Sequence, residues 1–568
     1  MKHILSRLTG RSLLYNKKDA VFQIIIVALL SAIITGSLFT GYSVRTSLKR
    51  TALEKLGKTE IVISSGSRYF DAFLSEEITG ITGKETVPIL ETDGYCQNFS
   101  TGTTALNVKI LGITKDFFSF NSIDSVFVES GTVAVNASLA QHLGIAPGDE
   151  IIIRFRDVDP LPANAPFAPS KNDQGSKVLK VSRILTPQKS GNFSLGITQI
   201  IPMNVFINIQ DMDSGEDTIY KANRLLVKDI NVVAASGALS KVLSPSDIGL
   251  TVRRSEKTGE PELISDRIFI DSIMVSDITR MIPSGSPLIT YLANALSVND
   301  KTTPYSFVTA LPLSLFPDTA PDAIIINRWL AGDLNASTGD TLTMKWYDAG
   351  SSGRLLKEKS KDFCISSIVD IAGTYSDASL MPDFPGISGS TTCSGWDAGV
   401  PILLDQIREK DEEYWNIYRG TPKAFISYKT GRLLWGNNFG TATAIRFPQS
   451  MQLPDIVSNL TGGLDPVRTG FMITDFRQSA EKAADESVDF STLFLGLSFF
   501  IIISCIVLFS MAVSVLFDSR KNQITVFYNL GIKNRFIKKL LFAEVTSLSV
   551  IGALPGVFLG YSVNILII

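Results

Sequence analysis

Two long apolar stretches near the C-terminal end limit what this chain can fold into. Residues 493–517 form a run of 25 without a charged side chain, and residues 540–568 contain only Glu544. A helix that crosses the ~30 Å hydrocarbon core of a bilayer needs about 20 such residues. The connector between the runs sets six basic residues against Asp518 alone: Arg520, Lys521, Lys533, Arg535, Lys538 and Lys539. The pattern predicts two spanning helices joined by a basic connector, and hydropathy alone leaves a plain membrane anchor equally open.

A third apolar stretch lies near the N-terminus. Residues 21–44 are uncharged, and residues 1–20 place leucine and isoleucine at helical spacing among basic side chains. A cleaved signal peptide is the alternative, but the run is longer than an ordinary signal core and no clear small-residue cleavage site follows. Basic residues precede this run and fill the later connector. The positive-inside rule therefore puts the N-terminal segment and the connector in the cytoplasm. We therefore expect an amphipathic helix on the inner membrane face, a retained spanning helix, and residues 45–490 outside the cell membrane.

The large middle region contains an internal repeat. Residues 133–149 align without gaps to residues 324–340, and residues 179–185 resemble 363–369 at a shifted offset. Six aligned pairs are identical: Asn136/Asn327, Leu139/Leu330, Ala140/Ala331, Leu143/Leu334, Gly148/Gly339 and Asp149/Asp340. Each copy predicts a strand that ends in Asn, a short helix, a Gly-Asp turn and a further strand. The sequence thus predicts a membrane protein with α-helical spans and a large α+β extracytoplasmic region of two related modules, at 45–270 and 271–490.

Composition narrows the classes of function. The chain is 45% hydrophobic and 19% charged with mean hydropathy +0.20, values between those of ordinary soluble and polytopic membrane proteins. A net charge of −2 gives no reason to expect a nucleic-acid partner. The only histidines are His3 and His142, which argues against histidine-ligated zinc, and His142 aligns with Asp333 in the repeat, which argues against a catalytic histidine. We therefore predict neither an enzyme nor a bound cofactor.

Several weaker patterns have simpler explanations. Gly57-Lys58-Thr59 imitates the end of a phosphate-binding loop, but Ala52 stands where the first glycine belongs. The acidic stretch 210–217 imitates a calcium loop with its glycine misplaced, so a solvated turn is the better interpretation. Glu412 and Glu413 are neighbours on a predicted helix and do not face each other across a substrate, which favours an exposed helix with an aromatic anchor.

Aromatic residues and cysteines of the middle region leave two points open. Residues 380–447 are rich in Trp, Tyr, Gly and Pro, and long segments of this composition are often functional. Trp396, Trp415, Trp435 and Tyr418 either pack the second module's core, which we favour, or form a partner surface. Cys505 lies inside a predicted span, and a disulfide between Cys364 and Cys393 is conceivable.

The connector and the last apolar run resemble the FtsX-like permease domain. The residues that carry the resemblance are Arg520, Ile524, Leu530 and Gly531, then Glu544, Gly552, Gly556 and Gly560. The three glycines are four residues apart, so they line one helix face along which another backbone can approach closely. Two departures from the family pattern are Gln523, where many members have Glu, and Tyr528-Asn529, where a small pair is usual.

Other segments are similar to macrolide-exporter-type (type VII) ABC transporter permeases. They are YLAN followed by PYS near 291–306, MPDFPG at 381–386, DEEYWNIYRGTPKAF at 411–425 and WGNNFGTATAIRF at 435–447. The resemblance implies segments 1–20, 21–44, 491–517, 518–540 and 541–568 in the roles of cytoplasmic helix, first span, second span, coupling loop and third span. It also implies a fourth span beyond Ile568, so we expect the chain to be the N-terminal portion of a longer permease.

The resemblance implies a permease subunit of the mechanotransmission type in a bacterial cell membrane, with its N-terminus in the cytoplasm. A separate ATPase would bind ATP and act on the coupling loop, and the movement would reach the extracytoplasmic region. The residues expected to receive it are Arg520, Gln523, Ile524, Phe527, Leu530 and Gly531. Expected partners are the ATPase, the bilayer, and either a second copy or a second permease half. The alternative is a membrane-anchored binding or adhesion protein that works without an ATPase.

Overall fold

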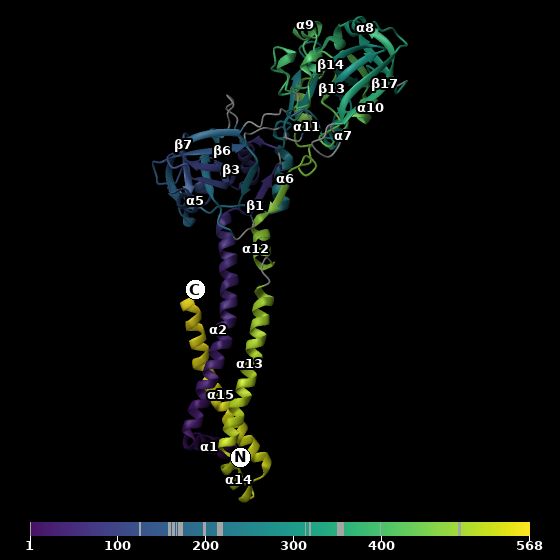
Figure 1. The fold of residues 1–568 in the computed structure, drawn as a ribbon. Coiled ribbons are helices and arrows are strands. Elements are labelled where there is room, and N and C mark those ends of the chain that lie inside the picture. The colour runs from purple at the N-terminus through teal and green to yellow at the C-terminus, as the bar shows by residue number, and fades with distance from the viewer. Residues whose placement is uncertain are drawn as a thin grey trace. The chain divides into compact units, whose positions relative to one another are not determined.

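A computed structural model describes residues 2–567 except 67, 124–125, 157–160, 162–164, 166, 169–173, 197–199, 213–219, 313, 317–319, 349–356, 398 and 487–489. The chain divides into a helical unit of residues 1–55, 195–200 and 477–568 and a sheet unit of residues 56–194 and 201–476 (Figure 1).

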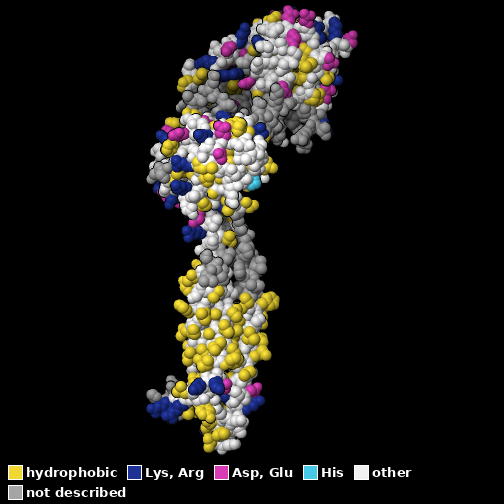
Figure 2. All heavy atoms as spheres, turned by 60° about the vertical axis from the view of Figure 1, so that its left-hand side comes forward, with side chains coloured by type: hydrophobic (Ala, Val, Ile, Leu, Met, Phe, Trp, Pro, Cys, Tyr) yellow, Lys and Arg dark blue, Asp and Glu magenta, His cyan; other side chains and the backbone are white. Residues whose placement is uncertain are grey.

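Among the residues that the structure describes, the helical unit is built from three long helices and three shorter ones. They are α1 (Lys2–Tyr15), α2 (Lys17–Leu56), α12 (Phe476–Glu486), α13 (Phe490–Ser519), α14 (Lys521–Asn529) and α15 (Asn534–Ile567). In the described part of the chain, three segments are long and apolar enough to cross a membrane: Lys17–Thr40, Phe499–Ser519 and Asn534–Val563. Figure 2 shows the hydrophobic side chains that cover these helices. These features indicate a membrane protein with a large region outside the bilayer.

The first of these helices is longer than predicted. The sequence suggested an end at residue 44, but α2 continues to Leu56. Residues 45–56 are rich in Arg, Lys and Leu, which favour helix, and the Arg50 Nε donates to Glu54 Oε1 one turn later at 2.7 Å. The helix therefore continues 12 residues beyond the span predicted at 21–44, and where it leaves the membrane stays a prediction.

The sheet unit contains two nine-stranded mixed sheets. The first has the order β20 (Met472–Asp475), β1 (Ile61–Ser64), β10 (Arg224–Val227), β3 (Thr86–Asn98), β4 (Thr104–Ile113), β8 (Asn204–Asn208), β5 (Thr132–Asn136), β7 (Gln174–Leu185) and β6 (Glu150–Arg156). The second has the order β11 (Leu250–Arg254), β12 (Pro261–Ser265), β19 (Ala444–Arg446), β13 (Ser286–Val298), β14 (Lys301–Leu311), β18 (Ala424–Ser427), β15 (Ala323–Asn327), β17 (Lys357–Val369) and β16 (Thr341–Asp348).

Short helices and one small ribbon complete the sheet unit. Its α-helices are α3 (Leu74–Thr82), α4 (Asp116–Phe120), α5 (Ala137–Leu143), α6 (Val232–Val242), α7 (Ser272–Met281), α8 (Arg328–Leu334), α9 (Glu409–Tyr418), α10 (Tyr428–Trp435) and α11 (Leu453–Leu460). Its 3-10 helices are Pro187–Lys189, Ile209–Asp211, Ser246–Ile248, Gly373–Ser376, Ala378–Leu380, Cys393–Gly395 and Leu404–Gln406. The ribbon pairs β2 (Phe70–Asp71) with β9 (Lys221–Ala222).

The local structure predicted for the two repeat copies is confirmed. Strands β5 and β15 each end in an asparagine that caps the next helix, with Asn136 Oδ1 accepting from Leu139 N at 3.1 Å and Asn327 Oδ1 accepting from Leu330 N at 2.8 Å. The Gly-Asp turns then lead into β6 and β16 through glycines with φ of 105° and 97°. Strand β5 pairs in parallel with β7 and β15 pairs in parallel with β17, and each pairing has one irregularity at the same place in the repeat.

The strand order also shows which segments of the sequence form each sheet. Strands β11 and β12 precede residue 271 yet belong to the second sheet, whereas β20 follows the whole second sheet and returns to the edge of the first. The boundary predicted at 270/271 therefore does not coincide with the boundary between the sheets. The cause is non-local: β20 pairs in antiparallel register with β1, at the opposite end of the unit's sequence.

One apolar core reaches from the first sheet into the second. It includes Ile63 and Val205 of the first sheet together with Leu263 and Ile445 of the second. A separate aromatic core lies at the second sheet, where Trp415 and Trp435 are buried and Trp396 packs against the core. The interpretation of these tryptophans as core residues is confirmed, whereas Tyr418 is only half-buried.

Candidate functional site

The connector between the last two membrane-length helices forms a short helix with a defined end. Helix α14 begins after Arg520 and ends at Asn529, and Gly531 has a left-handed φ of 77°. Ile532 N donates to Phe527 O at 3.1 Å and Gly531 N donates to Tyr528 O at 3.0 Å. This pair of hydrogen bonds is the Schellman motif, which places a left-handed residue, usually glycine, just after the helix. The turn accounts for Gly531 but makes no demand on the side chain before it.

Leucine 530, at the end of α14, is exposed. Its side chain is 70% accessible. By contrast Ile524 and Phe527 are half-buried, and Ile537 of α15 is buried. Leu530 is thus exposed, as are Val526 and Tyr528 of α14.

A buried ion pair joins the start of α14 to α15. Arg520 Nη1 donates to Glu544 Oε2, and the two side chains are only 2% and 1% exposed. The remaining groups of the pair, Arg520 Nε and Nη2 and Glu544 Oε1, have no hydrogen-bond partner among the described residues. Glu544 lies inside a membrane-length segment, where a charged residue is costly and usually functional. The sequence singled out both residues but gave no reason to pair them.

Polar contacts also join the connector to the N-terminal region. Gln523 and Asn16 exchange hydrogen bonds through their side-chain amides, at 3.0 Å and 3.4 Å. Ser12 Oγ accepts from Arg520 Nη1 at 3.4 Å, and Ser519 Oγ donates to Asp19 Oδ2 at 3.0 Å. Sequence reasoning missed these partners, and the only signal for them was the departure from the family pattern at Gln523.

The three glycines of α15 face α2. A Cβ atom added at Gly552 would lie 2.8 Å from Ile24 O, one at Gly556 would lie 2.4 Å from Ala28 O, and one at Gly560 would lie 2.7 Å from Ala32 O. Real Cβ atoms do not approach backbone oxygens so closely, so these positions exclude a larger residue while the helices keep this spacing. The glycines thus set how near α15 can lie to α2.

The N-terminal segment and the connector also carry exposed basic residues. They are Arg7, Arg11, Lys17, Lys18, Lys521, Lys533, Arg535, Lys538 and Lys539. Figure 2 shows Lys and Arg side chains gathered at one end of the helical part, next to the hydrophobic surface. A basic margin beside an apolar surface is typical of the cytoplasmic side of a membrane protein.

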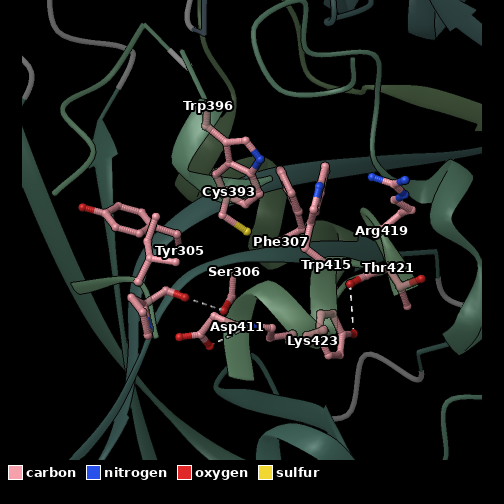
Figure 3. A pocket seen from close by; sticks show the side chains of 13 residues that line it. Tyr305, Ser306, Phe307, Cys393, Trp396, Asp411, Trp415, Arg419, Thr421 and Lys423 are labelled. Carbon is pink, nitrogen blue, oxygen red and sulfur yellow. Dashed lines mark hydrogen bonds and ion pairs between the residues drawn. The ribbon is translucent and has the colours of Figure 1, made fainter. Parts of the chain in front are cut away.

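The sheet unit holds a second cluster of buried charges that the sequence did not indicate. Lys423 is 4% exposed, its Nζ lies 3.7 Å from Asp411 Oδ1, and it stands 4.4 Å and 4.8 Å from the ring centres of Trp329 and Tyr414. Burial lowers the pKa of Lys423 to about 8. The adjoining cavity measures about 20 Å³, enough for about one water molecule, with Trp396 and Trp415 on its other side (Figure 3). Its size therefore makes it a packing feature of the core.

The remaining predicted candidates have structural roles or lie elsewhere. Glu412 accepts hydrogen bonds from the backbone N of Cys393 and Ser394 at 3.0 Å and 3.2 Å, so this carboxylate holds a turn. All four cysteines are free, which excludes the conceivable Cys364–Cys393 disulfide in this structure: Cys364 is exposed on β17 and Cys393 is buried. Of the calcium-like stretch 210–217, residues 213–217 lie outside the described residues.

Two solved structures resemble this chain weakly. No protein-family model and no curated protein matches the chain. The periplasmic region of MacB from Actinobacillus actinomycetemcomitans is 11% identical, with 33% of this chain and 83% of that chain covered and a TM-score of 0.22. A domain of a putative permease protein from Porphyromonas gingivalis is 12% identical, with 33% and 82% covered and a TM-score of 0.21. TM-scores this low do not show a shared fold.

Proposed function

We propose that this chain is the permease subunit of an ABC transporter of the mechanotransmission type. A separate cytoplasmic ATPase acts on α14, and the movement passes through the membrane helices to the sheet unit on the outer side for export, extraction or signalling. The basic residues around α14 and the N-terminus support the cytoplasmic placement of both. The resemblance of residues 520–560 to the FtsX-like permease domain supports the assignment to this type of transporter.

The observation that carries the proposal is the exposed Leu530 at the capped end of α14. A leucine with 70% of its surface accessible contributes little to folding, and the Schellman turn does not require it. Val526 and Tyr528 of the same helix are also exposed. Exposed apolar side chains near the end of a helix suit insertion into a groove on another protein.

The test is co-purification of an ATPase with the full chain from its own cells, followed by the same pull-down with Leu530→Ser. We expect the ATPase to be recovered with the wild-type chain and recovery to fall at least tenfold with the variant. The matched control is Leu433→Ser, which changes a leucine with 80% exposure on α10 of the sheet unit. Loss with the control as well would indicate a general effect, and the proposal would then lack support.

Folding of the variant is checked by thermal unfolding, because an exposed side chain should not alter the melting temperature. Recovery of the ATPase at the wild-type level with Leu530→Ser would contradict the role given to α14. A chain that brings down no ATPase would instead favour the anchored binding or adhesion protein.

Two finer points belong to the same proposal. The common strand order and the shared repeat suggest that the two sheets derive from one module that was duplicated. The exposed apolar faces of α2, α13 and α15 leave room for a second copy or a second permease half beside them. Cross-linking in membranes, with the size of the product, would test that pairing.

A further inference from the structure

The N-terminal segment contacts the connector along one continuous face. Ser12, Asn16 and Asp19 are spaced as neighbours on a helix, and the helical hydrogen bonds continue through the junction of α1 and α2, with Asn16 N donating to Ser12 O and Ala20 N donating to Asn16 O. Their partners, Ser519, Arg520 and Gln523, likewise lie within one turn of each other. Three polar contacts between two short segments fix both position and rotation.

The central contact is chemically specific. Asn16 Nδ2 donates to Gln523 Oε1, and Gln523 Nε2 donates to Asn16 Oδ1. Asn16 Nδ2 also donates to Ser12 O within its own segment at 3.1 Å. A glutamate at 523 offers only acceptors when ionised and loses the second of these bonds. The glutamine that departs from the family pattern therefore has a partner on the N-terminal segment, and the two residues suit each other.

The ion pair connects these contacts to α15. Arg520 contacts both Ser12 and Glu544, and it therefore links the N-terminal segment to α15. Asn16 stands directly before α2, which begins at Lys17 and continues to Leu56. A displacement of α14 thus has two ways into the membrane helices, through the covalent chain into α13 and α15 and through these contacts into α2.

We infer that α14 and the segment Ser12–Asp19 form one mechanical element, held by the amide pair of Asn16 and Gln523, and that a partner acting on α14 displaces the base of α2 at the same time. Asn16 and Gln523 are positioning residues in this element. The inference rests on the proposed function for the identity of the partner. We call the contact between these two amides the latch. It forms within the chain and does not require a partner.

The latch is tested first without any ATPase, by hydrogen exchange of α14 amides in the full chain in lipid nanodiscs. Asn16→Ala and Gln523→Ala should each speed the exchange about fivefold, as the loss of a typical hydrogen bond implies. The double variant should be no faster than Asn16→Ala, because both changes remove the same amide contact and only Asn16→Ala also removes the bond to Ser12 O. Asn522→Ala is the matched control, since Asn522 is an exposed amide residue on the same helix. Additive effects, or an equal effect of the control, would overturn the latch.

A second measurement places the latch in the working protein. In the ATPase complex, Asn16→Ala, a change outside the predicted coupling loop, should keep the ATPase bound but reduce the stimulation of ATP hydrolysis by the chain several-fold. Unchanged stimulation with this variant, with the complex intact, would overturn the inference while the proposed function stands. If no ATPase binds the wild-type chain, the proposed function fails, and the exchange experiment alone decides whether the latch exists.

Discussion

The buried ion pair of Arg520 and Glu544 should contribute to the stability of the helical unit as a pair. Removing one partner of a buried ion pair leaves an uncompensated charge and costs about 3–5 kcal/mol, whereas replacing both with apolar residues is often nearly neutral. We therefore expect Arg520→Met to lower the melting temperature in detergent strongly, and Arg520→Met combined with Glu544→Met to recover most of the loss.

The comparison that decides this prediction is between the double variant and the single one. If the double variant is as unstable as Arg520→Met alone, the pair does not act as a unit. Lys521→Met is the matched control, because Lys521 follows Arg520 directly and its ion pair with Asp518 is exposed.

Lys423 gives the sheet unit a pH dependence of stability. Its folded-state pKa of about 8 lies below the ordinary value of 10.5 because burial disfavours the ammonium. Between these values the unfolded chain binds more protons than the folded chain, so this group makes the fold more stable as pH rises from 8 to 10.5. Wild-type protein should gain in melting temperature relative to Lys423→Met across that window. Lys345→Met, which removes an exposed charge, is the control.

At the residue scale, the sequence predicted which side chains matter better than it predicted their partners. Arg520 and Glu544 were both singled out, but 24 positions separate them and no helical spacing relates them. Asn16 was not singled out at all, since its partner lies 507 positions away. Lys423 had no signal, because its burial results from aromatic residues on two other elements, Trp329 and Tyr414.

Helix packing in the helical unit depends on the face of α15 that carries Gly552, Gly556 and Gly560. A Cβ at Gly556 would lie 2.4 Å from Ala28 O and 2.6 Å from Ser31 Cβ, so Gly556→Val must push α15 away from α2. Overpacking of this kind costs about 1–3 kcal/mol. We expect a lower melting temperature, and Val557→Leu, on the exposed side of the same helix, should have little effect. Equal effects of the two variants would contradict the close approach of these helices.

At the element scale, local signals succeeded and a non-local pairing failed. The repeat predicted strand, cap, helix and turn in both copies, because an asparagine cap and a left-handed glycine act over three or four residues. The division at 270/271 missed the true composition of the sheets, because nothing within residues 472–475 shows that β20 pairs with β1. Short edge strands have too few residues for a pattern of their own.

The pairing of β1 with β20 closes the sheet unit at the point where the chain enters and leaves it. Strand β1 follows α2 in sequence, and β20 directly precedes α12. Phe476 N donates to Glu60 O at 2.9 Å, so in the antiparallel register Ile63 and Ile473 form a pair without mutual hydrogen bonds, in which the Cα atoms lie about 4.5 Å apart. Cysteines at these two positions suit a disulfide.

If the two strands stay paired throughout the working cycle, the first sheet is displaced as one body, and a permanent bond between them changes nothing. We therefore expect Ile63→Cys with Ile473→Cys to cross-link readily on oxidation and to retain wild-type stimulation of the bound ATPase. Each single cysteine variant, oxidised in the same way, controls for the substitutions themselves. Inhibition that a reductant reverses would mean that the strands separate when the ATPase acts. The movement would then open the edge of the first sheet instead of displacing that sheet as one body.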